Sequence, residues 1–342
     1  MKRQLHRTIA IGALLSLAIM LSAPPQVTAE SLPKKIVFGA NPPGSLYYVM
    51  AAGLGKVISA HTPMKVEVFP QGATVWYPML ESREVDFGIN VPGDILTAYK
   101  GEAIYEKPTK GKGFYLRTLM LGSPLRVGFL VPENSDLRGT QDIRGKRVPV
   151  DYGAFYSATL TVRALLANAG LTSKDVKGLT VTTYVAGVRT LIEGRSDFAM
   201  GSVGSGITNE LKTARGARYL DLDTSPEAVA RMQEVHPGYY PIKAKPGPAG
   251  LAKETIVMGK DITLIAGKHL SDDVAYHITK ALWDNYKELA PIHPGLKLWT
   301  PDRFASTRAV VPYHPGSITF YKEQGVWTKE LEEHQKKLLA IK

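Results

Sequence analysis

The sequence predicts an α/β protein of two lobes, joined by a hinge and enclosing a ligand cleft between them. Three observations support this fold class. Two blocks of sequence share one order of strand-like, turn-like and helix-like segments, two long apolar strand-like segments connect these blocks, and a helix with regular apolar spacing follows the second connection. Repeated strand–turn–helix units build mostly parallel α/β sheets, and two connections between lobes make a hinge.

Residues 1–29 are expected to form a secretory signal peptide. The basic segment MKRQLHR precedes the apolar segment TIAIGALLSLAIMLSA, and the small-residue pattern VTA ends just before Glu30. This pattern directs export, and the apolar run is short for a membrane span. The protein is therefore expected in the periplasm, with an uncleaved N-terminal anchor as the alternative.

Composition excludes several functional classes. The chain has no cysteine, so it forms no disulfide and uses no thiol in catalysis. The formal net charge is +11, but basic residues alternate with acidic ones, as in KELEEHQKK, so we expect a solvated basic surface and no nucleic-acid partner. The eight histidines are scattered without metal-ligand spacing, and we expect neither a metal site nor a cofactor.

The first block is expected to form the first part of lobe I, residues 32–129. The strand KIVF leads through the turn Asn41–Tyr47 into a helix, and the strand KVEVF leads through the turn Gln71–Trp76 into a second helix. The segment VDFGI then forms a third strand, which ends at Asn90–Asp94.

The second block, residues 130–254, is expected to form lobe II in the same order. Its strands KRVPV, LTVTTYV and DFAMG lead into the turns Tyr152–Thr159 and Ala186–Arg189 and the strand end Ser202–Gly206. Asp86 and Asp197 occupy equivalent places before the third strand of each block. This shared location predicts a structural role for both carboxylates.

Two apolar segments are expected to cross between the lobes. They are Thr118–Ser135 and Glu254–Gly267, and the helix Asp272–Leu289 follows the second crossing. Residues 255–342 would then return to lobe I and add C-terminal helices. We expect the hinge near Val127–Val131 and Ile256–Leu264, between two separately packed cores.

Parallel α/β sheets bind ligands at the carboxyl ends of their strands, where free N–H groups at helix starts attract anions. The four turns and the strand ends therefore predict an interlobe site. The candidate ligand-binding residues are Asn41, Gly44, Ser45, Leu46, Tyr47, Gln71, Ala73, Thr74, Trp76, Asn90, Gly153, Tyr156, Ser157, Thr159, Arg189 and Ser202.

Structural alternatives exist for several of these residues. Ser45 is also a plausible N-cap, Trp76 either stacks on a ligand or fills the core, and Arg189 either clamps a carboxylate or lies on the surface. The third turn is expected to contribute more than the first, because Pro42 and Pro43 have no N–H group to donate.

The order of several segments resembles the TAXI-type solute receptors of tripartite ATP-independent periplasmic (TRAP) transporters. The segments are PGSLYY, VDFGI, IRGKRV, DFAMG, HITKALWDN and PYHPGSITFYKEQGVW. The resemblance implies a type II periplasmic binding protein fold, and we expect the protein to be a monomer. The resemblance also implies capture of a small organic acid (a dicarboxylate, 2-oxo acid or acidic amino acid) for a sodium-driven permease, whose membrane subunits are often fused. Asn41, Pro42 and Pro43 depart from the glycine- and threonine-rich first turn of that family, as does Trp76 from its second turn.

Two other functional classes stay open on the sequence alone. One is a binding protein for an ABC importer or a sensor kinase, which a neighbouring ATPase or kinase gene would indicate. The other is a secreted enzyme on the same fold. The chain has neither a Gly-x-Ser-x-Gly motif nor a Walker loop, so we expect no catalytic residue and no enzyme activity.

Overall fold

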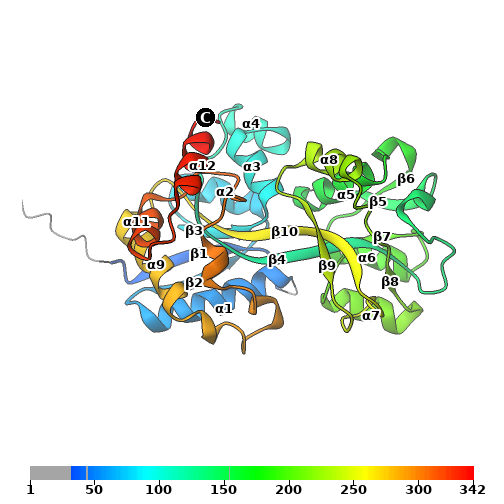
Figure 1. Ribbon diagram of the computed structural model, residues 1–342, viewed down its shortest axis with the longest axis horizontal. Helices are drawn as coiled ribbons and strands as arrows, with labels where there is room; N and C mark the ends of the chain where they lie inside the picture. Colours follow the sequence, from blue (N-terminus) through cyan, green and yellow to red (C-terminus); the bar gives the residue numbers. More distant parts are fainter. Residues whose placement is uncertain (1–31, 44, 154) are drawn as a thin grey trace, which may run out of the picture. The chain divides into compact units, whose positions relative to one another are not determined.

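The computed structural model describes residues 32–43, 45–153 and 155–342. The predicted signal peptide and the candidate residue Gly44 lie outside the described residues. Residues 32–342 form one compact unit, in which two groups of elements, lobes I and II, share two long strands (Figure 1).

Lobe I begins with three strand–helix pairs. They are β1 (Lys35–Ala40), α1 (Leu46–His61), β2 (Lys65–Pro70), α2 (Ala73–Ser82), β3 (Phe87–Asn90) and α3 (Pro92–Lys100). β1 lies between β2 and β3 and is parallel to both. The short helix α4 (Glu106–Thr109) follows before the chain leaves this lobe.

The two predicted crossing segments are confirmed as long strands. β4 (Arg117–Val131) and β10 (Thr255–Ala266) pair antiparallel from Arg117 opposite Ala266 to Val127 opposite Met258. Figure 1 shows them side by side, running from the lobe I elements to the lobe II elements. In lobe I, β10 pairs with β3.

Lobe II repeats the element order of lobe I. It contains β5 (Arg147–Asp151), α5 (Tyr156–Asn168), β6 (Lys177–Thr180), α6 (Tyr184–Ile192), β7 (Ala199–Ser202) and α7 (Gly206–Arg215). β5 and β6 are parallel, and β7 pairs with β4. Then come β8 (Arg218–Tyr219), α8 (Pro226–Val235) and β9 (Tyr240–Ala244), of which β8 pairs with β4 and β9 with β10. The predicted class of two α/β lobes is confirmed.

The equivalent aspartates have the predicted structural role. The Oδ2 atom of Asp86 accepts a hydrogen bond from the N–H of Val37 in β1 at 2.7 Å. Similarly, Oδ2 of Asp197 accepts one from the N–H of Arg147 in β5 at 2.8 Å. Each carboxylate therefore ties the first strand of its lobe to the chain entering the third, which supports an internal repeat.

The prediction of two separately packed cores is wrong. The largest buried apolar cluster includes Phe38 of lobe I and Phe198 of lobe II. Buried residues of the crossing strands, such as Phe129 and Leu264, belong to the same cluster. The cores merge because β4 and β10 are buried along most of their length.

The C-terminal segment adds helices α9 (Asp272–Asp284), α10 (Pro301–Phe304), α11 (Pro315–Glu323) and α12 (Lys329–Leu339). The hydroxyl of Tyr321 in α11 donates to the carbonyl oxygen of Leu119 in β4 at 2.8 Å, so the segment packs on the lobe I end of that strand. None of the helices in the described part of the chain combines the length and the apolar character needed to cross a membrane.

Candidate ligand-binding cavity between the lobes

A cavity of about 440 Å³ lies between the two lobes, a size typical of small-molecule sites. Lobe I contributes Asn41, Ser45, Leu46, Tyr47, Gly72 and His293 to its lining. Lobe II contributes, among others, Phe155, Ser157, Tyr184, Val185, Ser202 and Ser205. The crossing strands contribute Leu125, Val127 and Lys260. The cavity therefore has walls from both lobes and from the strands that join them.

The starts of helices α1, α2, α5, α6 and α7 converge on this cavity. Their N-cap residues all line it, namely Ser45, Gly72, Phe155, Thr183 and Ser205. The first N–H groups of a helix have no partner within the helix, and the helix dipole is positive at that end. The cavity therefore suits a negatively charged group.

At the start of α1, Ser45 is an N-cap. Its Oγ accepts a hydrogen bond from the N–H of Tyr48 at 3.2 Å and donates to the carbonyl oxygen of Pro42 at 2.7 Å. Asn41 is only 8% exposed and lines the cavity, and its side-chain amide has no hydrogen-bond partner among the described residues. Asn41 is thus available to a ligand, whereas the hydroxyl of Ser45 is engaged locally.

At the start of α5, the hydroxyls of Ser157 and Thr159, which were both predicted to contact the ligand, have different surroundings. Ser157 is 4% exposed and lines the cavity, and its hydroxyl has no hydrogen-bond partner within the described chain. Thr159 Oγ1 accepts from the N–H of Tyr152 at 3.0 Å, so Thr159 stabilises the turn. No side chain caps this helix.

The opposite wall of lobe II is held by a hydroxyl network. The Oη of Tyr184 accepts from the N–H of Ser202 at 2.8 Å and shares a hydrogen bond with Ser205 Oγ at 2.7 Å. This links the starts of α6 and α7 to the end of β7. Tyr184 was not predicted because the turn was placed at Ala186–Arg189, whereas α6 begins at Tyr184 after the N-cap Thr183. A threonine just before an apolar helix was the available signal. Ser205 lies in the predicted strand end Ser202–Gly206, although it was not among the candidate ligand-binding residues.

Lys260 brings a buried cation to the cavity. It is 3% exposed, and its Nζ donates to Thr161 Oγ1 at 2.5 Å, while that hydroxyl donates to the carbonyl oxygen of Ser157 at 2.6 Å. Burial lowers the pKa of Lys260 to about 7, against an opposing effect of Asp94. In the described structure, Lys260 has no carboxylate within ion-pairing distance. Sequence reasoning missed it because it lies within a strand.

Beside this lysine lies a buried carboxyl group on α3. Asp94 is 2% exposed and accepts hydrogen bonds from Asn90 Nδ2 at 2.5 Å and from the hydroxyl of Tyr105 at 2.9 Å. Burial raises the pKa of Asp94 to about 6. The amide of Asn90, a candidate ligand residue, also donates to Tyr77 Oη at 3.1 Å. The side chain of Asn90 therefore forms its hydrogen bonds within lobe I, and Asn90 does not line the cavity.

The structure places Trp76 in the core of lobe I. Its side chain is fully buried, and a Cβ atom added to Gly39 of β1 would lie 2.7 Å from the indole ring. At Gly88 of β3 the distance would be 2.4 Å. The ring thus packs flat on the sheet because both strands carry glycine there, and of the two alternatives the structure favours core packing.

Six of the candidate residues line the cavity: Asn41, Ser45, Leu46, Tyr47, Ser157 and Ser202. Besides Trp76, Asn90 and Thr159, those that do not line it are Gln71, Ala73, Thr74, Gly153, Tyr156 and Arg189. Gly153 is exposed, with a φ of 53°, and Arg189 forms a 3.0 Å ion pair with Glu210. Ligand contact by the six remains a prediction. The described residues include no group of three or more side chains placed to hold a metal ion.

The chain is similar to many solved structures at low identity, among them the following three. It is 17% identical to a putative periplasmic sulfonate-binding protein, SsuA, of a sulfonate ABC transporter from Methylobacillus flagellatus KT, with a TM-score of 0.49 over 86% of this chain and 95% of that one. It is 12% identical to a TctC solute binding protein from Polaromonas (TM-score 0.47, 78% and 88% covered). It is 14% identical to a mutant of ArgBP from T. maritima (TM-score 0.46, 78% and 95% covered). These scores are too low to decide a ligand or a partner.

A family model gives a firmer result. The model described as the NMT1-like family matches residues 38–325, which include both lobes and both crossing strands. The match therefore covers every element that contributes to the cavity. On this ground, the chain belongs to the NMT1-like family.

Proposed function

We propose that this protein is a periplasmic solute receptor that captures a small organic acid and delivers it to a membrane transporter. The observation that carries the proposal is the convergence of helix starts from both lobes on one cavity. Their N–H groups favour an anion, and Lys260 adds a buried amino group that a bound carboxylate would hold in its charged form. The described lining residues include no aspartate or glutamate, so no carboxylate side chain among them repels a bound acid directly.

The mechanism we propose is closure of the lobes around the ligand. Lobe I would comprise residues 32–129 and 255–342, and lobe II residues 130–254, with the hinge in β4 and β10. A ligand that contacts both lobes binds the closed state better than the open state, and so shifts the population toward it. The closed surface would then dock on the permease.

For the partner, we propose a sodium-driven TRAP permease, on the strength of the resemblance to TAXI-type receptors. We further propose that the protein binds its ligand without catalysis. Incubation of a bound acid with the protein should leave the acid chemically unchanged by mass spectrometry. Detection of a product in proportion to protein concentration would favour an enzyme instead.

A thermal-shift screen tests the ligand class. Ligand that binds only the native state adds ~2.7 kcal/mol of apparent stability at a hundredfold excess over its Kd. We therefore expect monocarboxylates, dicarboxylates or 2-oxo acids to raise the Tm, with sodium chloride at equal ionic strength as the control. If only sugars or cationic compounds raise the Tm, the proposed function is wrong.

A further inference from the structure

Of the five helix starts that line the cavity, those of α1 and α5 carry polar side chains without a hydrogen-bond partner among the described residues, and the wall formed by β4, β7 and α6 includes several apolar side chains. We infer that the ligand is a monoanion with an aliphatic or aromatic body, and that it carries neither a second acidic group nor an ammonium group. This inference rests on the proposed function, which it narrows from organic acids in general to one chemical class.

The anionic pole lies where the starts of α1 and α5 face the cavity. Asn41 and Ser157 are both more than nine-tenths buried, line the cavity and have no side-chain hydrogen-bond partner among the described residues. Lys260 lies against the first turns of α5, because its Nζ donates to Thr161 Oγ1, which donates in turn to the carbonyl oxygen of Ser157. Asn41, Ser157 and Lys260 all line the same cavity, so an amide donor, a hydroxyl donor and an amino group are available there to one carboxylate.

The apolar wall comes from three other elements. Leu125 and Val127 of β4 are 6% and 1% exposed, Met200 of β7 is 3% exposed, and Val185 of α6 completes the surface. A second carboxylate against these side chains would lose its hydration without gaining a partner, which is strongly unfavourable. Aliphatic or aromatic groups bury there favourably.

The charged side chains of the lining fit a ligand with a single negative charge. The described lining holds no arginine to clamp a second carboxylate, and no aspartate or glutamate to pair with an ammonium group. His293 lines the cavity, but its Nδ1 accepts from the N–H of Gly295 at 3.0 Å. This hydrogen bond engages one ring nitrogen of His293 within the chain.

Calorimetry with matched compounds tests the inference on the purified protein. The probes are 4-methylpentanoate and 3-phenylpropanoate, the amides of both acids, leucine, phenylalanine and glutarate. We expect at least one of the two monoacids to bind at least tenfold more tightly than its own amide, than the matching amino acid and than glutarate. Tighter binding of glutarate or of an amino acid overturns this inference but leaves the proposed function intact. If none of these probes binds but another acid raises the Tm in the thermal-shift screen, this inference alone fails, whereas if no acid in that screen raises the Tm, the proposed function fails with it.

A pair of lysine variants tests the anionic pole. Lys260→Met keeps the length of the side chain but removes the charge, so monoacid binding should weaken at least tenfold, while amide binding changes by less than threefold. Lys243→Met is the matched control. Lys243 lies on β9, forms an exposed ion pair with Glu254 and does not line the cavity. If Lys260→Met fails to fold by circular dichroism, Ser157→Ala replaces it with the same expected direction. Unchanged monoacid affinity in the folded variant contradicts the assigned pole.

Discussion

Lys260 lines the cavity, and its charge should depend on whether a ligand is bound there. Burial lowers its pKa to about 7, so the free protein holds it partly neutral at physiological pH. The titratable groups around it are Asp94 on α3, with a pKa raised to about 6, and His236, with a pKa lowered to about 3. Burial raises the pKa of Tyr47 and of Tyr239 well above the ordinary value for a tyrosine, so both stay neutral at physiological pH. Among these groups, Lys260 alone titrates between pH 7 and 9.

This arrangement predicts proton uptake on ligand binding. A bound carboxylate favours the charged ammonium and raises its pKa, so the complex takes up a proton above pH 7. Affinity should therefore fall as the pH rises from 7 to 9, because Lys260 must be protonated at a growing cost to pair with the carboxylate. Calorimetry at pH 8 in buffers of different ionisation enthalpy measures the uptake, which should disappear in Lys260→Met. A flat affinity profile in the native protein would contradict the linkage.

Three hydroxyl variants separate ligand contact from local structure. Ser157→Ala removes a cavity hydroxyl that has no hydrogen-bond partner among the described residues, and it should weaken binding about tenfold, since a hydrogen bond to a charged group is worth ~1.5–3 kcal/mol. Thr159→Ala should instead lower the Tm, because it leaves the N–H of Tyr152 without its acceptor. Ser45→Ala should cost about 1 kcal/mol of stability through loss of the N-cap. Calorimetry showing the strongest binding loss in Ser45→Ala would move the anion to lobe I.

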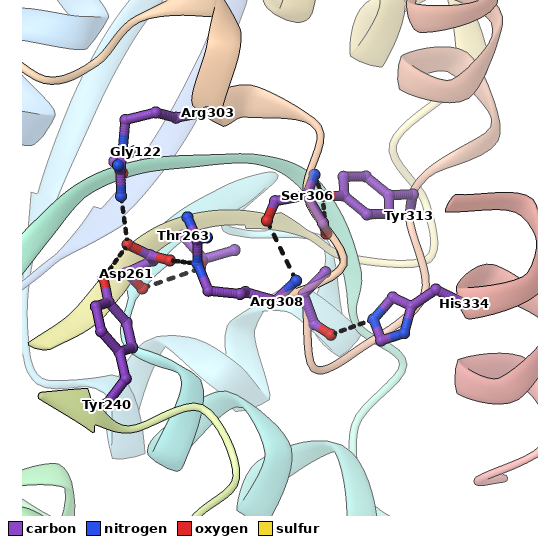
Figure 2. Close-up of polar contacts among 10 residues, drawn as sticks. Gly122, Tyr240, Asp261, Thr263, Arg303, Ser306, Arg308, Tyr313 and His334 are labelled. Carbon is purple, nitrogen blue, oxygen red and sulfur yellow. Dashed lines mark hydrogen bonds and ion pairs between the residues drawn. The ribbon is translucent and has the colours of Figure 1, made fainter. Parts of the chain in front are cut away.

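At the scale of elements, one buried carboxylate joins three segments at the crossing strands. Asp261 of β10 is 1% exposed and accepts hydrogen bonds from Arg303 Nη2 of α10 at 2.7 Å, from Arg308 Nε and from the hydroxyl of Tyr240 of β9 at 2.7 Å (Figure 2). Arg303 also donates from Nε to the carbonyl oxygen of Gly122 in β4 at 3.2 Å. The cluster thus connects the C-terminal segment to both crossing strands.

Asp261→Asn should destabilise the fold. Removing one partner of a buried ion pair leaves the other charge uncompensated and lowers the free energy of unfolding by about 3–5 kcal/mol. We expect a loss of about 3 kcal/mol here, because the side chain of Arg308 is partly exposed. Urea unfolding should show a lower midpoint. Asp284→Asn is the control, since its pair with Lys280 is exposed and such pairs contribute about 0.3–0.5 kcal/mol. Equal midpoints for both variants would show that the cluster adds no stability.

At the scale of the whole molecule, ligand should close the lobes. Small-angle scattering should give a smaller radius of gyration with a saturating monoacid, with an unchanged far-UV circular dichroism spectrum. Gly206→Phe should block this compaction, because Gly206 lines the cavity and a Cβ added there meets open space. Asn209→Phe, on the exposed side of the same helix, should compact normally. Compaction of Gly206→Phe to the native extent would contradict closure around this cavity.

The sequence by itself determined the repeated element order, the two crossing strands and the convergence of turns. These features follow from local patterns: apolar periodicity, small residues in turns and the placement of Asp86 and Asp197 are all visible along the chain. Asn41 and Ser157 were found because strand ends and helix starts can be located from those patterns. The start of α6 was misplaced by a few residues, since element boundaries are the least certain part of such reasoning.

Only the tertiary structure decided which polar side chains remain free for a ligand. Ser157 and Thr159 are near neighbours with similar groups, yet Thr159 bonds to Tyr152 while Ser157 has no hydroxyl partner in the described chain. Lys260 faces the cavity because β10 crosses between the lobes, and the merging of the two cores depends on the same strands. Such facts depend on pairings between residues far apart in the chain, and local sequence patterns do not encode those pairings.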